Sequence, residues 1–342
     1  MKKLLLLSLA VGALMTSRAQ DKELLITKSL SSETIRNVKV ETSGGAISVT
    51  GGAAADARVE VYVRANSNRK PTKEELQAQL NERYDLEISV ANNKLTCIAK
   101  PKDRKMDWKK GLSISFRVYV TKEVATDLAT SGGSIDLRNV NGEQDFRTSG
   151  GSLTVDQVSG NIKGRTSGGS IHLSNSKDDI DLATSGGSIE AKNCEGKLRL
   201  TTSGGSVNLG QLKGNINATT SGGSVRGSDV DGDLSAFTSG GSVDLDNMKC
   251  NLEAGTSGGS VHVQITEMRK YCKLTNSGGH IDVSIPANKG VDLDISGGKI
   301  QTDKLTNFSG TVKDDQVNGK MNGGGMALTV NAGSGRVSLA IK

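Results

Sequence analysis

Hydrophobic and polar residues alternate along most of this chain in a pattern that repeats every eighteen residues. Each repeat opens with the tetrapeptide Thr-Ser-Gly-Gly, and a copy that stands apart begins at Thr42. A short fixed period is typical of repeat proteins whose units stack along one axis. The regularly spaced copies begin at Thr130, Thr148, Thr166, Thr184, Thr202, Thr220, Thr238 and Thr256.

Within each repeat, apolar residues occupy fixed slots. With the Thr counted as slot one, they fall at slots six, eight, eleven, fifteen and seventeen. Apolar residues that alternate with polar ones indicate strands with one buried face. We therefore expect two short strands per coil that face each other across a thin core. In the coil from Thr202 these apolar residues are Val207, Leu209, Leu212, Ile216 and Ala218.

The residues between the strands predict two corners. At the first corner, two adjacent glycines permit positive φ and leave no Cβ where neighbouring backbones pass closely. The second corner lies near slot thirteen, where glycine recurs as Gly142, Gly160, Gly196, Gly214 and Gly232. We expect the amide-rich slot ten, and the Thr and Ser of each motif, to stack as ladders that satisfy buried polar groups. Slot ten holds Asn139, Gln157, Asn175, Asn193, Gln211, Asp229 and Asn247.

These features predict an all-β fold: a single-stranded, right-handed parallel β-helix, or β-solenoid, with 18-residue coils and a small helix-containing insertion near the N-terminus. The right hand follows from the general preference of parallel crossovers.

The sequence divides into three parts. Residues 1–19 have the basic start, apolar run and small residues before a cut after Ala19 that mark a signal peptide. Residues 20–125 hold the first coil, interrupted by a strand-helix-strand insertion or cap whose helix starts at a capping box from Thr72 to Glu75. Residues 126–342 form a β-solenoid of 18–20-residue TSGGS coils, whose period drifts after Thr256.

Charge gives little sign of nucleic-acid binding. Removal of the signal peptide takes away Lys2, Lys3 and Arg18 and lowers the formal charge from +6 to +3. Acids and bases are interspersed along the repeats, apart from a basic cluster between Lys100 and Lys110. We interpret that cluster as a solvated loop, with a patch for an anionic ligand as the alternative, and Trp108 within it as a packing anchor.

We assign no catalytic, cofactor-binding or metal-binding residues. His172, His262 and His280 are too scattered to share a metal, and only one half of each coil carries the Gly-Gly that a calcium-binding β-roll needs in both halves. The cysteines show no metal-ligand spacing. Cys194 falls in an apolar slot and is expected to be a buried thiol, while a Cys250–Cys272 disulfide remains an alternative.

The signal peptide, the early SGGAISV coil, the insertion and the long run of TSGGSI/V-x-L coils together resemble the bacterial putative-adhesin family of exported β-solenoid proteins, a domain of unknown function. The resemblance covers residues 38–342 and implies a non-enzymatic, extracytoplasmic protein. It supplies no catalytic residues.

We therefore expect a non-enzymatic adhesin-like or cell-surface scaffold protein that presents a repetitive binding surface. It would be exported to the periplasm, the outer cell surface or the medium, with no transmembrane segment after signal removal. The expected partners are cell-envelope glycans, surface proteins, or other copies through the solenoid ends, and not nucleic acid. The alternatives are a carbohydrate-active enzyme, of polysaccharide lyase or glycosidase type, on a parallel β-helix, and a self-assembling structural polymer.

Overall fold

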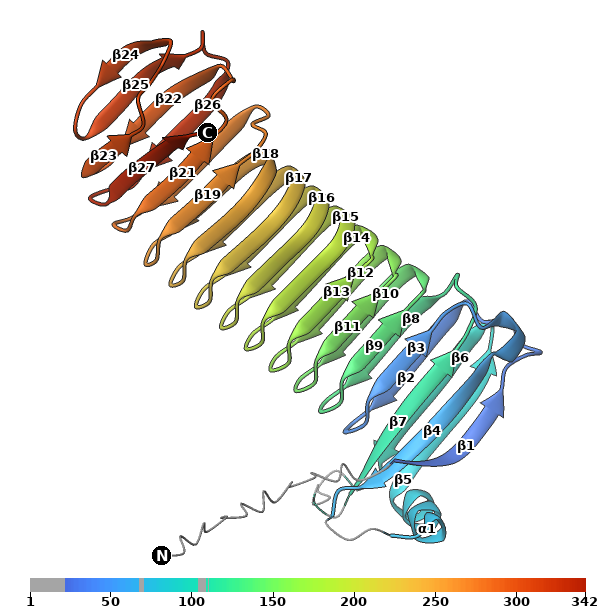
Figure 1. Ribbon diagram of the computed structural model, residues 1–342. Helices are drawn as coiled ribbons and strands as arrows, with labels where there is room; N and C mark the ends of the chain where they lie inside the picture. Colours follow the sequence, from blue (N-terminus) through green and yellow to red (C-terminus); the bar gives the residue numbers. More distant parts are fainter. Residues whose placement is uncertain (1–21, 68–70, 104–108, 110) are drawn as a thin grey trace, which may run out of the picture.

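The computed structural model describes residues 22–67, 71–103, 109 and 111–342, which form a long rod of stacked β-strands (Figure 1). The expected signal peptide and Trp108 lie outside the described residues. Among those described, α1 (Lys73–Arg83) is the one α-helix, and a short 3₁₀ turn spans Ala54–Asp56. The expectation of an all-β, solenoid-like fold with one helix in an N-terminal insertion is confirmed.

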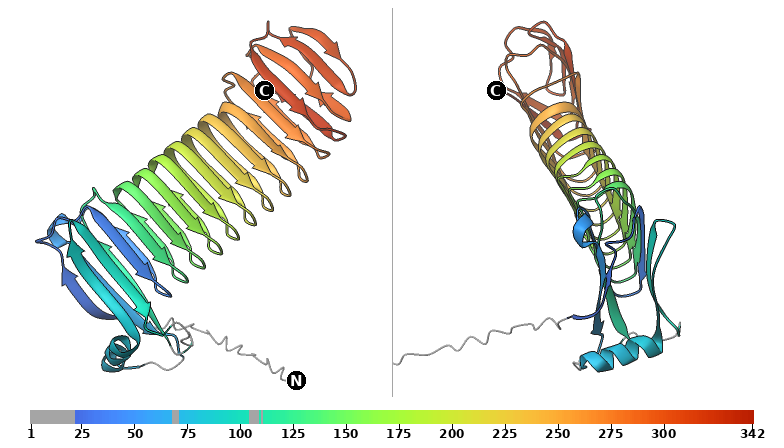
Figure 2. Two further views of the ribbon diagram at one scale, coloured as in Figure 1. Left: turned by 180° about the vertical axis from the view of Figure 1, so that it is seen from behind. Right: turned by 90° about the vertical axis from the view of Figure 1, so that its right-hand side faces the viewer.

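Two facing layers of strands, here called the two sheets, run the length of the rod, and each is extended by one strand per coil (Figure 2). The strands that bend through the second corner join the two layers into one hydrogen-bonded sheet of 27 strands. In the central part, equivalent strands pair in parallel, so that Ile189 lies opposite Val207 and Val207 opposite Val225. In β15, β16, β17 and β18 the two strands of a coil join into one continuous strand that bends through the second corner. The central strands are β8 (Ala125–Thr130), β9 (Ile135–Arg138), β10 (Asn141–Thr148), β11 (Leu153–Asp156), β12 (Ser159–Thr166), β13 (Ile171–Ser174), β14 (Lys177–Thr184), β15 (Ile189–Thr202), β16 (Val207–Thr220), β17 (Val225–Thr238), β18 (Val243–Thr256) and β19 (Val261–Ile265).

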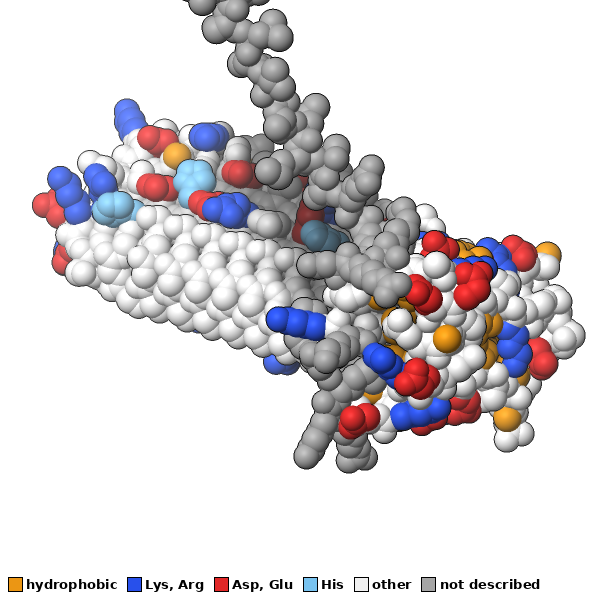
Figure 3. Space-filling model, turned by 90° about the horizontal axis from the view of Figure 1, so that it is seen from below, with side chains coloured by type: hydrophobic (Ala, Val, Ile, Leu, Met, Phe, Trp, Pro, Cys, Tyr) orange, Lys and Arg blue, Asp and Glu red, His pale blue; other side chains and the backbone are white. Residues whose placement is uncertain are grey.

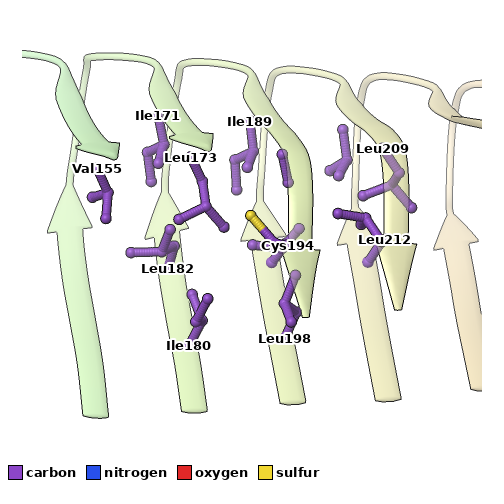
Figure 4. Close-up of a cluster of buried hydrophobic side chains, with 14 of the residues drawn as sticks. Val155, Ile171, Leu173, Ile180, Leu182, Ile189, Cys194, Leu198, Leu209 and Leu212 are labelled. Atoms are coloured by element: carbon purple, nitrogen blue, oxygen red, sulfur yellow. The ribbon is translucent and has the colours of Figure 1, made fainter. Parts of the chain in front are cut away.

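The core is a single thin layer between the two sheets. Figure 4 shows Ile171 and Leu173 directed toward the layer from one strand and Ile180 and Leu182 from the next strand of the same coil. All four are at most 2% exposed. The apolar slots six, eight, eleven, fifteen and seventeen are therefore the inward positions, as the alternation predicts.

At the N-terminal end the chain does not stack in sequence order. The coil made by β2 (Asn37–Thr42) and β3 (Ile47–Thr50) lies between β8 and β9 on one side and β6 (Lys94–Pro101) and β7 (Leu112–Tyr119) on the other. The insertion thus adds a terminal layer to the rod. Antiparallel strands then finish the two sheets: β4 (Arg58–Ala65) and β1 (Glu23–Ser29) on one, β5 (Tyr84–Ala91) on the other. Leu76 and Leu80 of α1 are buried against this cap, and its capping box is formed.

The C-terminal end is threaded in the same out-of-order way. The last strands of the chain, β26 (Met326–Asn331) and β27 (Arg336–Ile341), lie between β20 (Tyr271–Asn276) and β21 (Ile281–Ile285) on one side and β22 (Val291–Ser296) and β23 (Lys299–Thr302) on the other. An antiparallel pair, β25 (Gln316–Met321) and β24 (Phe308–Val312), continues the sheet from β22. The sequence predicted continued coils to the end and missed this reversal.

The second glycine of each Thr-Ser-Gly-Gly is required by close packing between coils. A Cβ added to Gly169 would lie 2.0 Å from the carbonyl oxygen of Gly151, the equivalent glycine one coil earlier, whereas one added to Gly168 meets nothing closer than 3.6 Å. Neither glycine has positive φ. The expectation of close backbone approach at this corner is correct, and the expectation of positive φ is wrong.

Positive φ belongs instead to the second corner. All seven slot-ten residues have φ between 50° and 56°, the left-handed region in which Asn and Asp are tolerated best. These side chains are exposed or half-buried, so the expected ladder of buried amides is wrong. Some neighbours do bond, as Asn193 Nδ2 does to Asn175 Oδ1 at 3.4 Å. Backbone conformation, not burial, thus explains the Asn and Asp residues at slot ten, whereas Gln157 and Gln211 adopt the same φ without that preference.

Candidate binding groove along the Thr-Ser-Gly-Gly corner

Each of the eight regularly spaced repeats supplies three hydroxyl groups at the first corner, the Thr and Ser of the motif and the Ser that follows it at slot five, and the fold uses two of them. The Thr at slot one is buried: Thr166 Oγ1 donates to Gly151 O of the preceding coil at 2.8 Å and accepts from Gly169 N at 3.3 Å. The Ser at slot five accepts from the next coil, as Ser188 Oγ does from the backbone of Ser206 at 3.1 Å. These columns satisfy the corner's polar groups, as the sequence predicts for the Thr.

The Ser at slot two is different. Its backbone takes part in the ladder between coils, where Ser149 N donates to Ser131 O at 3.1 Å. Its side chain is exposed in every motif from Ser43 to Ser277. Among the residues that the structure describes, none of these slot-two hydroxyls has a hydrogen-bond partner. They form a straight column of hydroxyls, spaced by about 4.8 Å, that the fold leaves free.

Figure 3 shows the rod from the side of these corners. A long face without charged or hydrophobic side chains runs along the coils, with charged side chains at its border. The face is made of the motif's Ser and Gly residues, of which slots two and three are exposed throughout.

A groove follows the column beside six successive coils near the N-terminal end. It has a volume of about 720 Å³, and its direction along the rod suits an extended molecule. The buried Thr of slot one, the free Ser of slot two and the residues of slot eighteen line it. The slot-eighteen positions are Glu41, Ala129, Arg147, Arg165, Ala183 and Thr201, joined by Ala99 and Lys100 from the cap.

The cations of the groove are individually balanced. Lys100 Nζ lies 3.3 Å from Glu41 Oε2, and Arg147 Nη1 lies 3.7 Å from Asp127 Oδ1. The guanidinium of Arg165 donates to the backbone oxygen of Asp181 at 2.7 Å and to the carboxylate of Asp181 at 2.5 Å. Because each base faces an acid, the groove offers many hydrogen-bond donors but little net charge. Neutral hydroxyl-rich ligands match it better than a polyphosphate backbone does.

A second polar cluster lies on the outer face of the N-terminal cap. Buried Glu60 accepts from Arg58 Nε at 2.7 Å and from Tyr62 Oη at 2.9 Å. Arg58 stacks over the ring of Tyr119 at 3.9 Å, and Arg117 over that of Tyr62 at 4.4 Å. Burial alone would raise the pKa of Glu60, but the hydrogen bonds from Arg58 and Tyr62 outweigh it and the pKa is lowered. This cluster joins β4 to β7 and is a structural element of the cap.

The cysteines are buried, free thiols in this structure. Burial raises the pKa of Cys97 and Cys250 to about 12 and that of Cys194 to about 11, and raises that of Cys272 further. Cys194 is 2% exposed in its apolar slot, as expected, and the alternative Cys250–Cys272 disulfide is not formed.

The histidines lie apart on the surface. His172 Nδ1 lies 3.3 Å from Glu190 Oε2 of the next coil, and His280 Nε2 lies 3.5 Å from Arg336. Within the described ranges, no group of three or more His, Cys, Asp or Glu is placed to hold a metal. Among the same residues, no helix is long and apolar enough to cross a membrane.

Sequence reasoning treated the motif's hydroxyls alike and did not foresee the groove. The available signal was slot eighteen, which changes from Arg147 and Arg165 to the small Ala183 and Thr201 along the rod. Of the basic cluster, Lys100 borders the groove and Lys102 Nζ donates to Asn81 O at 2.8 Å. The part of this cluster from 104 to 108, and residue 110, lie outside the described residues.

The family model for Toastrack, DUF4097, matches residues 10–340, so this chain belongs to that family of unknown function. The expected membership of the putative-adhesin family, a domain of unknown function, is thereby confirmed. No curated protein matches the chain.

Two solved structures are similar to it. One is a putative cell adhesion protein from Clostridium sporogenes, with 8% identity, a TM-score of 0.22, and coverage of 94% of this chain and 100% of the other. The second is a putative adhesin from Bacteroides fragilis, with 13% identity, a TM-score of 0.23, and coverage of 94% and 99%.

Proposed function

We propose that this protein is an exported, non-enzymatic adhesin-like scaffold that binds an extended, hydroxyl-rich polymer along the Thr-Ser-Gly-Gly corner, with cell-envelope glycans as the partner class. The single observation that carries the proposal is the column of exposed, unpartnered slot-two hydroxyls beside a groove of about 720 Å³. A column with a constant spacing lets weak contacts add along a repeating ligand.

The charge balance supports a glycan over a nucleic acid. Lys100, Arg147 and Arg165 each have an acidic partner. A binder of nucleic acid needs many cations free to neutralise phosphates. Surface proteins of the cell envelope are the second partner class, and the same face would contact them.

The lining also supports a binding role over catalysis. Glycoside hydrolysis commonly uses a pair of carboxylates that flank the scissile bond, and Glu41 is the one acid among the groove's lining residues. A carbohydrate-active enzyme on this fold is the alternative, and cleavage of any polysaccharide in a panel would establish it.

The finer features of the chain belong to the same proposal. We take eighteen residues as the length of one coil, supported by hydrogen bonds between residues eighteen apart, and a right hand for the winding. We propose residues 1–19 as the signal peptide, 20–125 as the interrupted first coil with its cap, and 126–342 as the solenoid. Export to the periplasm, the cell surface or the medium follows from that signal peptide.

The test compares two triple variants that differ only in position. Ser149→Ala, Ser167→Ala and Ser185→Ala together remove slot-two hydroxyls inside the groove. Ser221→Ala, Ser239→Ala and Ser257→Ala remove equivalent hydroxyls outside it. The probes are purified peptidoglycan and a panel of neutral and acidic polysaccharides, with binding measured by co-sedimentation and calorimetry.

We expect the groove variant to bind at least about tenfold more weakly than the wild-type protein, and the distal variant to bind within about twofold of it. Equal binding by both variants would place the ligand elsewhere. A wild-type protein that binds no polysaccharide but retains protein components of an envelope fraction would replace the glycan with the second partner class.

A further inference from the structure

The ends of the two sheets differ in how their edges are protected. An unpaired strand edge can recruit another chain, and proteins prevent this with bulges, charges, short strands or covering segments. Four strands end the sheets of this rod: β1 and β5 at the N-terminal end, β23 and β24 at the C-terminal end.

Three of these edges carry protection. β1 has a bulge between Leu24 and Ile26. β5 has acidic side chains, and the Nζ of Lys28 bonds to Ile88 O on its open side at 2.9 Å. β23 is only four residues long, and Ile300 N on its open side donates to Asp314 O at 2.7 Å.

The fourth edge, β24, has none of these devices. Its sequence Phe-Ser-Gly-Thr-Val contains no charge, and the residues from Ser309 to Val312 are exposed. Val312 is 56% exposed, the highest fraction among the exposed large hydrophobic residues of the described chain. Figure 1 places β24 at the far end of the rod from α1, on the outside of the last sheet.

The hydrogen-bond register shows which backbone groups of β24 are open. Lys313 N donates to Gln316 O at 2.8 Å, and Asn322 N donates to Asn307 O at 3.0 Å. In an antiparallel pair, residues alternate between bonding the partner strand and pointing away from it. The residues at 309 and 311 therefore bond to β25, while Phe308, Gly310 and Val312 direct their N–H and C=O groups outward. Among the described residues, β24 pairs with β25 alone.

The three outward-facing residues of β24, Phe308, Gly310 and Val312, are arranged symmetrically about Gly310. If a second β24 lies antiparallel with Gly310 opposite its own copy, then Phe308 lies opposite Val312, and every outward group meets a partner. Gly310 brings no side chain to the axis. The ring of Phe308 covers this part of the strand, because a Cβ at Gly310 would lie 2.8 Å from Phe308 Cζ and one at Gly319 would lie 2.6 Å from it. An aromatic ring over strand glycines is a known way to stabilise them.

We propose that two copies of this protein pair through β24 and form an end-to-end dimer with a two-fold axis at Gly310. The same patch is used on both copies, so the contact closes after two chains. The protected edges at β1 and β5 leave the outer ends of the dimer inert. The expected assembly is thus a dimer of rods, not the open-ended polymer that stood as an alternative from the sequence, and it doubles the number of grooves per particle. This inference does not depend on the proposed glycan binding.

The first test is sedimentation velocity over a wide concentration series. The interface is short, so the dimer is expected to be weak and to dissociate on dilution. Val312→Pro removes an outward N–H without removing a bond to β25, and proline is tolerated on edge strands in that position. We expect the dimer boundary to be lost in this variant. The matched control is Ile88→Pro, an outward-facing position on β5 at the opposite end, which is expected to dimerise like the wild-type protein.

The second test fixes the register. Residues 309 and 311 would face each other as a non-hydrogen-bonded pair, with Cα atoms about 4.5 Å apart, close enough for a disulfide. The double variant Ser309→Cys/Thr311→Cys is expected to form a covalent dimer on mild oxidation. Ser309→Cys alone is expected to form little. The natural thiols are buried and do not interfere.

Several results would overturn the proposal. They are a wild-type protein that stays monomeric at all concentrations, a dimer that persists in Val312→Pro, cross-linking that is equal in the single and double cysteine variants, or growth into larger oligomers. Circular dichroism of each variant establishes that loss of the dimer does not come from loss of folding.

Discussion

The second glycine of the motif offers the sharpest test of how the coils pack. Gly169→Ala introduces a Cβ at 2.0 Å from Gly151 O and 2.3 Å from its carbonyl carbon. Carbon atoms in good contact are about 3.5–4.0 Å apart, so the two coils must separate by at least about 1 Å at this corner. Because the obstacle is backbone and not a flexible side chain, no rotamer change can relieve it.

The cost follows from the bonds at that point. Two hydrogen bonds cross between the coils at this corner: the buried Thr166 hydroxyl donates to Gly151 O at 2.8 Å, and Gly168 N donates to Ser149 O at 2.8 Å. Separation stretches these bonds and leaves buried polar groups without partners. Two lost hydrogen bonds at about 1 kcal/mol each, with about 1–3 kcal/mol for an unsatisfied buried group, give about 3–5 kcal/mol of lost stability.

The neighbouring glycine is the control. Gly168→Ala meets nothing closer than 3.6 Å, and Gly168 has no positive φ. Replacing such a glycine restricts the unfolded chain, so we expect a change between zero and about 1 kcal/mol of added stability. Denaturant unfolding by circular dichroism measures both variants, and hydrogen exchange shows whether the weakening is centred on the coils around residues 151 and 169. Equal stability of the two variants would refute the close-packing explanation.

Three further predictions concern the buried polar groups. Thr202→Val removes the hydroxyl that donates to Gly187 O at 2.7 Å and should cost about 1–3 kcal/mol in denaturant unfolding; Ser203→Ala, whose hydroxyl is free, should change stability by less than about 0.5 kcal/mol. Glu60→Gln should lower stability at neutral pH. Because the pKa of Glu60 is lowered in the folded protein, its contribution is present above its ordinary value of 4.5 and is lost as the pH falls through the lowered pKa, so the two unfolding midpoints should converge in acid. A thiol reagent at mildly alkaline pH should label no cysteine in the native protein and all four in denaturant, namely Cys97, Cys194, Cys250 and Cys272. A disulfide would reduce the number of cysteines labelled in denaturant to two.

Periodicity alone predicted the inward positions, because side-chain direction in a strand depends only on alternation. It also placed Cys194 in the core and the Thr hydroxyls at the corner. What it could not give was the conformation of the corners. Gly at slots three and four and Asn at slot ten both suggest turns. Only the structure shows that the first corner needs Gly for contact distance and that the second favours Asn for its positive φ.

The ends of the rod were beyond sequence reasoning for a different reason. Strands such as β26 and β27 have the same alternation as the coils before them, so nothing local shows that they pack between β20 and β22 and not after β23. The groove could not be predicted from the sequence for a similar reason. Its shape depends on the sizes of the residues at six slot-eighteen positions, such as Arg147 and Ala183, and on Lys100 from the cap.

The constant register of the central coils has an evolutionary consequence. Since β15, β16, β17 and β18 meet through equivalent pairs, one whole repeat can be deleted or duplicated and the flanking strands will still find matching partners. Recombination between near-identical gene segments would therefore lengthen or shorten the molecule in increments of about 4.8 Å, with both caps left intact. The length of the rod is then a trait that selection can adjust without redesigning any contact.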